Sequence, residues 1–496
     1  MEERSYDFIV VGAGSSGCVV AARLSESGRR RVLLLEAGPP TPWLATVPIS
    51  YSKFIDHPPV NWCFLSEPEA GTADRKIPVP RGRMVGGSSA LNGLVFVRGQ
   101  PLDYDAWAQM GNRGWSYDDV LPLFRRMESY EDGASELRGR DGPLHITEAR
   151  DESPLYDALF AAGREFGLER NPDYNGAEQE GICHTQTTIY RGRRMSAYQS
   201  YLVPARRRRN LVVQARAHVE RLLLDGRRCS GVRYRVDDAT LEATARAEVV
   251  LCAGSINSPQ ILELSGIGRP DVLAANGIEV RHALEGVGEN LRDHIAPRLR
   301  WQITRRGITY NDRARGLGLA RQILRYAFTR RGFLSLPSAP IIAFFRTRAE
   351  LATPDVQVHF IPFAIENVRK RELAREPGIT VSMYQLRPES TGSIHITSPD
   401  PMTAPAIRFN FLAAELDRQT LVAGLRCTRR IVEGRAMDEL RGVEVKPGAG
   451  VQSDDEILDY IRTTAETAYH PVGTCKMGID DKAVVDPELR VRGIDN

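Results

Sequence analysis

The chain has 496 residues, of which 42% are hydrophobic and 26% charged, so it can bury a large core and is not generally disordered. Its formal net charge of +3 is too balanced to indicate a nucleic-acid partner. No apolar run approaches the ~20 residues that a membrane-spanning helix needs, and the acidic first residues are not typical of a signal peptide. Seven scattered cysteines without a Cys-x-x-Cys pair indicate free thiols and no metal site, so we expect a cytoplasmic protein.

The first 36 residues have the pattern of a dinucleotide-binding unit. Residues 8–11 form a short apolar run that predicts a buried strand. The glycine motif of residues 12–17 follows, then a helical pattern over residues 18–24. A second apolar strand over residues 31–35 ends at Glu36. This order of strand, glycine turn, helix, strand and acid predicts a Rossmann-like fold.

Each conserved feature of such a unit has a physical role that these residues can fill. Gly12 permits the tight turn, Gly14 lets a pyrophosphate approach the backbone, and Gly17 lets helix and strand pack closely. The diphosphate would lie on free amides at the helix N-terminus. Glu36 can accept hydrogen bonds from ribose hydroxyls, which argues against NADP but does not separate FAD from NAD.

Two later segments carry further small and polar residues at turns. Residues 82–93 read Gly-Arg-Met-Val-Gly-Gly-Ser-Ser-Ala-Leu-Asn-Gly, so backbone and hydroxyls can contact a flat polar ligand. The apolar strand expected over residues 249–253 runs into Gly254-Ser255 and a helix start. That arrangement favours a second phosphate-binding turn.

These two segments closely resemble the signature segments of the glucose-methanol-choline (GMC) oxidoreductases. The resemblance extends over nearly the whole chain, including residues 61–62, 142–144 and 286–291 and the His-Pro-x-Gly-Thr motif that begins at His470. It implies an extended FAD, oxidation of alcohols, and oxygen or a quinone as electron acceptor. The positions that match FAD-binding positions of the family are Gly12, Gly14, Ser15, Ser16, Gly17, Glu36, Ala37, Trp62, Arg81, Gly82, Val85, Gly86, Gly87, Ser88, Asn92, Gly93, Leu94, Val95, Val219, Ala253 and Gly254.

Two departures from the family pattern refine this expectation. Leu91 stands where some relatives tether the flavin through a histidine, so we expect non-covalent FAD. Ala296 stands where choline-acting members carry a glutamate, which makes choline a poor substrate because its cation lacks a carboxylate partner. We therefore expect an uncharged primary alcohol. The chain is most similar to bacterial choline dehydrogenases and membrane-associated alcohol dehydrogenases, which allows, but does not require, a peripheral contact with the inner membrane.

The resemblance also implies two interleaved domains. The α/β flavin domain would comprise residues 1–150, 211–298 and 463–496, and the α+β substrate domain, built on an antiparallel sheet, residues 151–210 and 299–462. Local patterns predict strands over residues 355–361, 380–384 and 392–396, and a helix over residues 454–468. In the family, the stretch that ends here at Asn496 runs on for roughly 40 residues with another sheet strand and a second catalytic residue, so we expect weak FAD binding by these residues alone.

His470 is the candidate base. Oxidation of an alcohol by a flavin moves a hydride from carbon and a proton from oxygen, and histidine has a pKa suited to taking that proton. His470 lies in the motif where the family places its active-site histidine, whereas we interpret His294 as structural. Asn92 fits a place near the flavin ring and a turn cap equally well.

Other functions remain open at this point. Some members of the family split cyanohydrins, and others decarboxylate fatty acids in light. Leu386, where the photoenzymes carry a cysteine, and the presence of His470 both favour alcohol chemistry. A binding protein with a vestigial fold is disfavoured by the intact phosphate turns.

Overall fold

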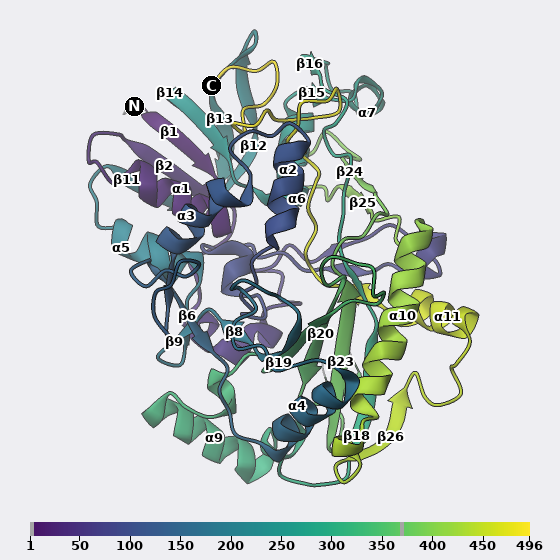
Figure 1. The fold of residues 1–496 in the computed structure, drawn as a ribbon. Coiled ribbons are helices and arrows are strands. Elements are labelled where there is room, and N and C mark those ends of the chain that lie inside the picture. Colours follow the sequence, from purple (N-terminus) through teal and green to yellow (C-terminus); the bar gives the residue numbers. More distant parts are fainter. Residues whose placement is uncertain (1–3, 368–371) are drawn as a thin grey trace.

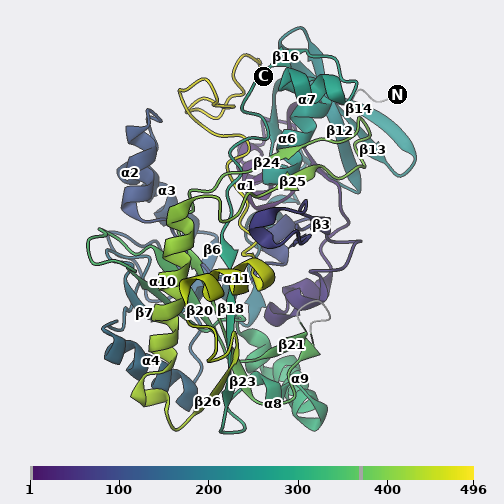
Figure 2. The ribbon, with the colours of Figure 1, turned by 90° about the vertical axis from the view of Figure 1, so that its right-hand side faces the viewer.

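Two six-stranded sheets organise the computed structural model, which describes residues 4–367 and 372–496. The first sheet lies at one end of the molecule together with α6 and α7, and the second lies at the other end with α4, α10 and α11 (Figures 1 and 2). The helices are α1 Ser15–Leu24, α2 Pro101–Gln109, α3 Tyr117–Met127, α4 Pro154–Phe166, α5 Val203–Ala205, α6 Gly254–Leu264, α7 Pro270–Ala275, α8 Tyr310–Arg313, α9 Gly316–Thr329, α10 Glu415–Val432 and α11 Asp454–Thr464.

The first sheet combines a parallel half with an antiparallel half. Its strand order is β11-β2-β1-β14-β13-β12, and β11, β2, β1 and β14 run parallel. The strands are β1 Ser5–Val11, β2 Val32–Glu36, β11 Leu211–Ala215, β12 Ala217–Asp225, β13 Arg228–Val236 and β14 Ala239–Leu251. β2 is buried along its whole length, as parallel strands covered on both faces are.

The predicted opening unit of strand, turn, helix and strand is present, with shifted boundaries, since β1 begins three residues earlier than predicted and β2 is displaced by one residue. α1 begins at Ser15, three residues before the predicted start, because Gly14 caps it and both serines already adopt helical geometry. Similarly, β14 begins at Ala239, ten residues before the predicted strand, since its first half pairs with β13.

The second sheet is antiparallel throughout, with the order β26-β18-β23-β20-β19-β7. Its strands are β7 Gly181–His184, β18 Arg298–Ile303, β19 Ile341–Phe345, β20 Val356–Ile361, β23 Gly378–Gln385 and β26 Arg441–Lys446. α10 crosses β20 and β23 at close range, because a Cβ built on Gly424 would lie 2.2 Å from Met383 Cε. We propose that the two sheets are the centres of the two predicted domains.

Several short strand pairs lie outside the two large sheets. They include β3 Phe64–Leu65 with β4 Pro78–Val79, β15 Ile267–Gly268 with β16 His282–Ala283, β17 Ile295–Ala296 with β27 Glu466–Thr467, and β24 Ser393–His395 with β25 Ala406–Arg408. The strand predicted over residues 392–396 is therefore not a neighbour of β23 in the large sheet. The helix predicted over residues 454–468 ends at Thr464, because the next residues form β27 and pair with β17.

Among the helices in the described part of the chain, none combines the length and the apolar character needed to cross a membrane.

Candidate active site

The predicted glycine turn opens on a cavity of about 630 Å³ at the carboxyl ends of β1 and β2. Gly12 has φ +96°, and a Cβ on it would lie 2.6 Å from the carbonyl oxygen of Cys252. A Cβ on Gly17 would lie 1.8 Å from the Gly12 oxygen, so helix and turn touch there. Beside Gly14, by contrast, the nearest atom would be 4.0 Å away. The backbone thus leaves room for a ligand beside the N-terminus of α1.

Most of the residues predicted to bind FAD line this cavity or the larger one next to it. Gly12, Gly14, Ser15, Ser16, Glu36, Ala37, Trp62, Arg81, Gly82, Gly87, Ser88, Val219, Ala253 and Gly254 line the smaller cavity. The larger cavity is lined by Asn92, Gly93, Leu94 and Val95. Ser15, Arg81 and Ser88 line both, so the two cavities meet at these side chains.

Three predicted positions, Gly17, Val85 and Gly86, line neither cavity and pack the glycine turns instead. The Gly86 amide donates to the Ala13 oxygen at 2.7 Å, and the Val85 amide donates to the Pro39 oxygen at 3.0 Å. A Cβ on the neighbouring Gly87 would lie 2.7 Å from Gly14 Cα. These residues hold the turn of residues 12–17 against the segment of residues 82–93. They can therefore affect a ligand only by changing the backbone conformation of these two segments.

Glu36 ends β2 inside the smaller cavity with both carboxylate oxygens fixed. Oε2 accepts from the Ala13 amide and Oε1 from the Gly38 amide, each at 2.9 Å. Burial raises the pKa of Glu36 to about 7, and the two amides oppose that rise. Each oxygen retains a lone pair that can accept from a ligand hydroxyl.

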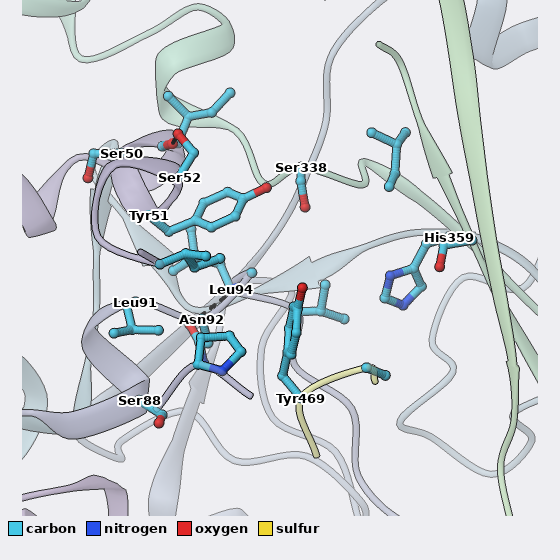
Figure 3. Close-up of a pocket in the computed structure, with 18 of the residues that line it drawn as sticks. Ser50, Tyr51, Ser52, Ser88, Leu91, Asn92, Leu94, Ser338, His359 and Tyr469 are labelled. Atoms are coloured by element: carbon cyan, nitrogen blue, oxygen red, sulfur yellow. Dashed lines mark hydrogen bonds between the residues drawn. The ribbon is translucent and has the colours of Figure 1, made fainter. Parts of the chain in front are cut away.

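The larger cavity has a volume of about 1620 Å³ and contains a cluster of histidine and tyrosine side chains. The His470 ring lies 5.4 Å from the His294 ring and 6.0 Å from the Tyr384 ring, centroid to centroid. His359 lies 5.5 Å from Tyr384. Figure 3 shows His359, Tyr469, Asn92 and Tyr51 around this space.

His294, which we interpreted from the sequence as structural, lines the same cavity as His470. Its Nδ1 lies 2.5 Å from the Gln385 carbonyl oxygen and therefore carries the hydrogen, which leaves Nε2 as an acceptor. His359 and Tyr384 were missed altogether. Gln357 and His359 are the polar alternates of an otherwise apolar strand, and that alternation was the available signal.

Asp293 ties the two histidine-bearing segments together. Its Oδ1 accepts from the backbone amides of His294, at 2.7 Å, and of His470, at 3.0 Å. Its Oδ2 accepts from the Thr467 hydroxyl. Burial raises the pKa of Asp293 to about 6, while these donors and the nearby Arg81 cation lower it. One buried carboxylate thus fixes the backbone on both sides of the cluster.

The residue before His470 has an unusual backbone that its neighbours determine. Tyr469 has φ +69°, a left-handed conformation that is rare for a tyrosine. Its amide donates to Thr467 Oγ1 at 2.7 Å, and its carbonyl oxygen accepts from Arg81 Nη2. The direction of His470 is therefore set by the same contacts.

His470 presents a neutral imidazole to the larger cavity. Its side chain is open to the cavity, although protein surrounds the ring on its other sides. Desolvation, followed by the nearby His294, Arg81 and His359, lowers the pKa of His470 well below its ordinary value. The imidazole is therefore neutral and has a free acceptor nitrogen.

Asn92 makes the turn contact that the sequence allowed and also lines the larger cavity, while its place near a flavin ring stays a prediction. Its Oδ1 accepts from the Leu94 amide at 3.2 Å, as in a turn, and from Arg194 Nη1 at 2.6 Å. The residue is exposed and lines the larger cavity. With the oxygen fixed in this way, the amide nitrogen is the group available to donate to a ligand.

The cavity walls offer no unpaired carboxylate to a cationic substrate among the described residues that line them. Ala296 lines the cavity, and Glu466, its partner across β17 and β27, is paired with Arg298 at 2.7 Å. Asp103, the acid among the described residues that line this cavity, is paired with Arg387 at 2.7 Å. No cluster of His, Cys, Asp or Glu within the described ranges could hold a metal ion.

Comparison with known proteins gives one consistent result. A family model described as GMC oxidoreductase matches residues 6–296 with its N-terminal part and residues 388–496 with its C-terminal part. An oxygen-dependent choline dehydrogenase of Brucella ovis is 40% identical over 492 residues, covering 99% of this chain and 89% of the relative. One of Photobacterium profundum is 40% identical over 500 residues, with coverage of 99% and 87%.

Solved structures agree with these sequence relatives. A pyridoxine 4-oxidase from Mesorbium loti superposes with a TM-score of 0.89 at 31% identity, covering 99% of this chain and 92% of that one. A formate oxidase of Aspergillus oryzae superposes with a TM-score of 0.92 at 26% identity, covering 100% and 93%.

Proposed function

The chain belongs to the GMC oxidoreductase family, and on that premise we propose that it oxidises an uncharged primary alcohol to an aldehyde with His470 as the base. The protein is an FAD-dependent oxidoreductase of alcohols. The observation that supports the role of His470 is its neutral imidazole, which is open to the larger cavity on a backbone whose amide Asp293 fixes.

The two cavities fit an extended FAD. The open backbone beside Gly14, the fixed carboxylate of Glu36 and the N-terminus of α1 suit an adenosine diphosphate in the smaller cavity. The larger cavity leaves space for the flavin ring beside Asn92 and His470. The chemistry that FAD supplies when bound is acceptance of a hydride from the alcohol carbon.

The residues of this chain handle the proton and the orientation. We propose that the free ring nitrogen of His470 accepts the hydroxyl proton as the hydride leaves the adjacent carbon, so that the alcohol loses both hydrogens and becomes an aldehyde. The Asn92 amide and His294 Nε2 are polar groups that can orient a substrate or flavin edge. Leu91 is a buried hydrocarbon wall of the cavity, which supports non-covalent binding of FAD.

An uncharged substrate is favoured by the charges around Ala296. A quaternary ammonium there would lie near Arg298, whose partner Glu466 is already engaged. Apolar side chains such as Ile323 and Phe333 line much of the same cavity. They favour an aliphatic or aromatic alcohol.

Oxygen or a quinone is the proposed electron acceptor. A reducing compartment such as the cytoplasm is supported by the seven cysteines, which are all free. His470 and Leu386 both line the larger cavity, so the site offers no specific support to a lyase or a photodecarboxylase.

The test is anaerobic mixing of the FAD-loaded protein with benzyl alcohol, octanol and choline while the flavin absorbance near ~450 nm is followed. We expect bleaching by the two uncharged alcohols and little by choline. If choline reduces the flavin faster than either alcohol does, the proposed substrate class is wrong.

A further inference from the structure

Helix α9 is unusually exposed for a helix of a folded protein. Of its 14 residues, Tyr326 is the buried one. Leu317, Leu324 and Phe328 are 91%, 58% and 85% exposed. Because they are spaced by seven and four residues, they lie along one face of the helix. α9 lies at the outer edge of the molecule in both views (Figures 1 and 2).

The opposite face of α9 belongs to the larger cavity. Leu319, Ile323, Tyr326 and Ala327 line it, and the Tyr326 hydroxyl donates to the Gly192 carbonyl oxygen at 2.9 Å. The helix is thus a wall with the cavity on one side and exposed apolar side chains on the other. Trp43, which is 78% exposed, lines the same cavity.

Arginines accompany the exposed apolar face. Between residues 312 and 331 the chain carries six arginines and one acid, Asp312, which gives this segment a formal charge of +5. Arg321 and Arg325 belong to α9 itself, and Arg330 and Arg331 follow its end. Asp151 lies close enough to Arg325 to interact with it, but one further acid leaves the segment strongly basic.

We propose that α9 docks on the surface of an anionic lipid bilayer, with Leu317, Leu324 and Phe328 in the acyl boundary and the arginines at the headgroups. An amphipathic helix with apolar and basic residues on its exposed surface has the chemistry that such a surface binds. A second copy of the chain fits less well, because a symmetric contact would place one +5 segment against another.

This docking would place α9, which forms a wall of the larger cavity, at the surface of the bilayer. If the proposed function holds, an apolar alcohol dissolved in the lipid would reach the cavity along α9 and beside Trp43. Tryptophan is a residue typical of the membrane–water interface. The binding itself rests on the exposed side chains of α9 and not on the catalytic role of any residue.

The test is co-sedimentation of the FAD-loaded full chain with phosphatidylcholine vesicles, with and without about one-third phosphatidylglycerol. We expect binding to the anionic vesicles that weakens in high salt, and at least ~tenfold weaker binding to pure phosphatidylcholine. The triple variant Leu317→Ser, Leu324→Ser, Phe328→Ser should lose at least ~tenfold in binding. None of these three side chains lines the cavity in the described structure, so reduction by a short soluble alcohol should be unchanged.

A control is Met402→Ser, Val443→Ser, Ile479→Ser, which removes three apolar side chains elsewhere that are 50%, 64% and 64% exposed and should leave vesicle binding intact. A second variant, Arg321→Glu with Arg331→Glu, should remove the preference for phosphatidylglycerol. It tests the proposal independently if the triple variant fails to fold. Absence of binding by the original chain, or unchanged binding by both α9 variants, would overturn the proposal. So would a dimer in solution that the triple variant converts to a monomer, since a second copy would then cover this face.

Discussion

The two cavities are built in different ways. Three glycine-containing turns, each within a short stretch of sequence, bring backbone to the smaller one. The working groups of the larger one are side chains from four separate segments, at His294, His359, Tyr384 and His470. A backbone cavity tolerates changes that keep its glycines, whereas the side-chain cavity depends on contacts such as those of Asp293.

The largest expected effect concerns the side-chain cavity. His470→Ala should retain FAD but slow anaerobic flavin reduction by ~10²–10⁴-fold, because a general base is lost. Stopped-flow absorbance with a good alcohol substrate measures the rate. His57→Ala, an exposed histidine outside both cavities, is the control. An unchanged rate in His470→Ala would place the base elsewhere.

A single methyl group should damage the backbone cavity. In Gly17→Ala the new Cβ would lie 1.8 Å from the Gly12 oxygen, so the turn must shift. We expect FAD binding weakened roughly tenfold to a hundredfold, measured by titration of flavin fluorescence. Gly450→Ala, where a Cβ meets nothing within 4 Å, should bind FAD normally. Equal affinities in both variants would show that the close contact is not needed.

A smaller effect is expected at Asp293, which accepts hydrogen bonds from the backbone amides of His294 and His470. Asp293→Asn keeps an acceptor for the two amides but removes the charge beside Arg81, so His470 should be held less accurately. We expect flavin reduction to slow roughly tenfold, with an altered pH profile and little change in KM.

Asp417→Asn is the matched control for Asp293→Asn. Asp417 is equally buried and accepts from the amides of Glu389 and Ser390 at 2.8 and 2.9 Å, but it does not line the larger cavity. That variant should lose stability without changing the pH profile. If both variants change the profile alike, Asp293 has only a structural role.

The smallest effect lies outside both cavities, at His395. Its Nδ1 is 2.7 Å from Glu263 and its Nε2 3.0 Å from Glu289. Desolvation lowers its pKa, but the two carboxylates raise it more, so the folded value lies above the ordinary one. The contacts of His395 with Glu263 and Glu289 therefore stabilise the fold fully at pH values below the pKa of His395 in the unfolded chain. This stabilisation is lost as the pH rises through the pKa of His395 in the folded protein.

Urea unfolding between mildly acidic and mildly alkaline pH measures this loss. His395→Gln should be less stable at the lower pH and should show a flatter pH dependence than the original chain. If the free energy of unfolding depends on pH in the same way in both proteins, His395 does not stabilise the fold through its two glutamate contacts.

The same contrast explains what the sequence could reveal. The glycine turn, Glu36 and α1 were predictable because their motif is local and each glycine has a local reason. The proximity of His294 and His359 to His470 was not predictable, because it arises only when β17 pairs with β27 and β20 joins the antiparallel sheet. No local pattern reports such distant pairings. The alternation of polar Gln357 and His359 with apolar residues along β20 was the one sign of the larger cavity that this strand carried in the sequence.

The glycine turn has a consequence for how the chain folds. Gly12 lies against the carbonyl oxygen of Cys252. β1 pairs in parallel with the nearby β2 and also with β14, which follows more than two hundred residues later. The contact between Gly12 and Cys252 therefore requires the closure of a long loop, which costs entropy before the contact can stabilise the fold. We expect that this side of the nucleotide turn is completed only after β14 has left the ribosome, and that FAD binds after that step.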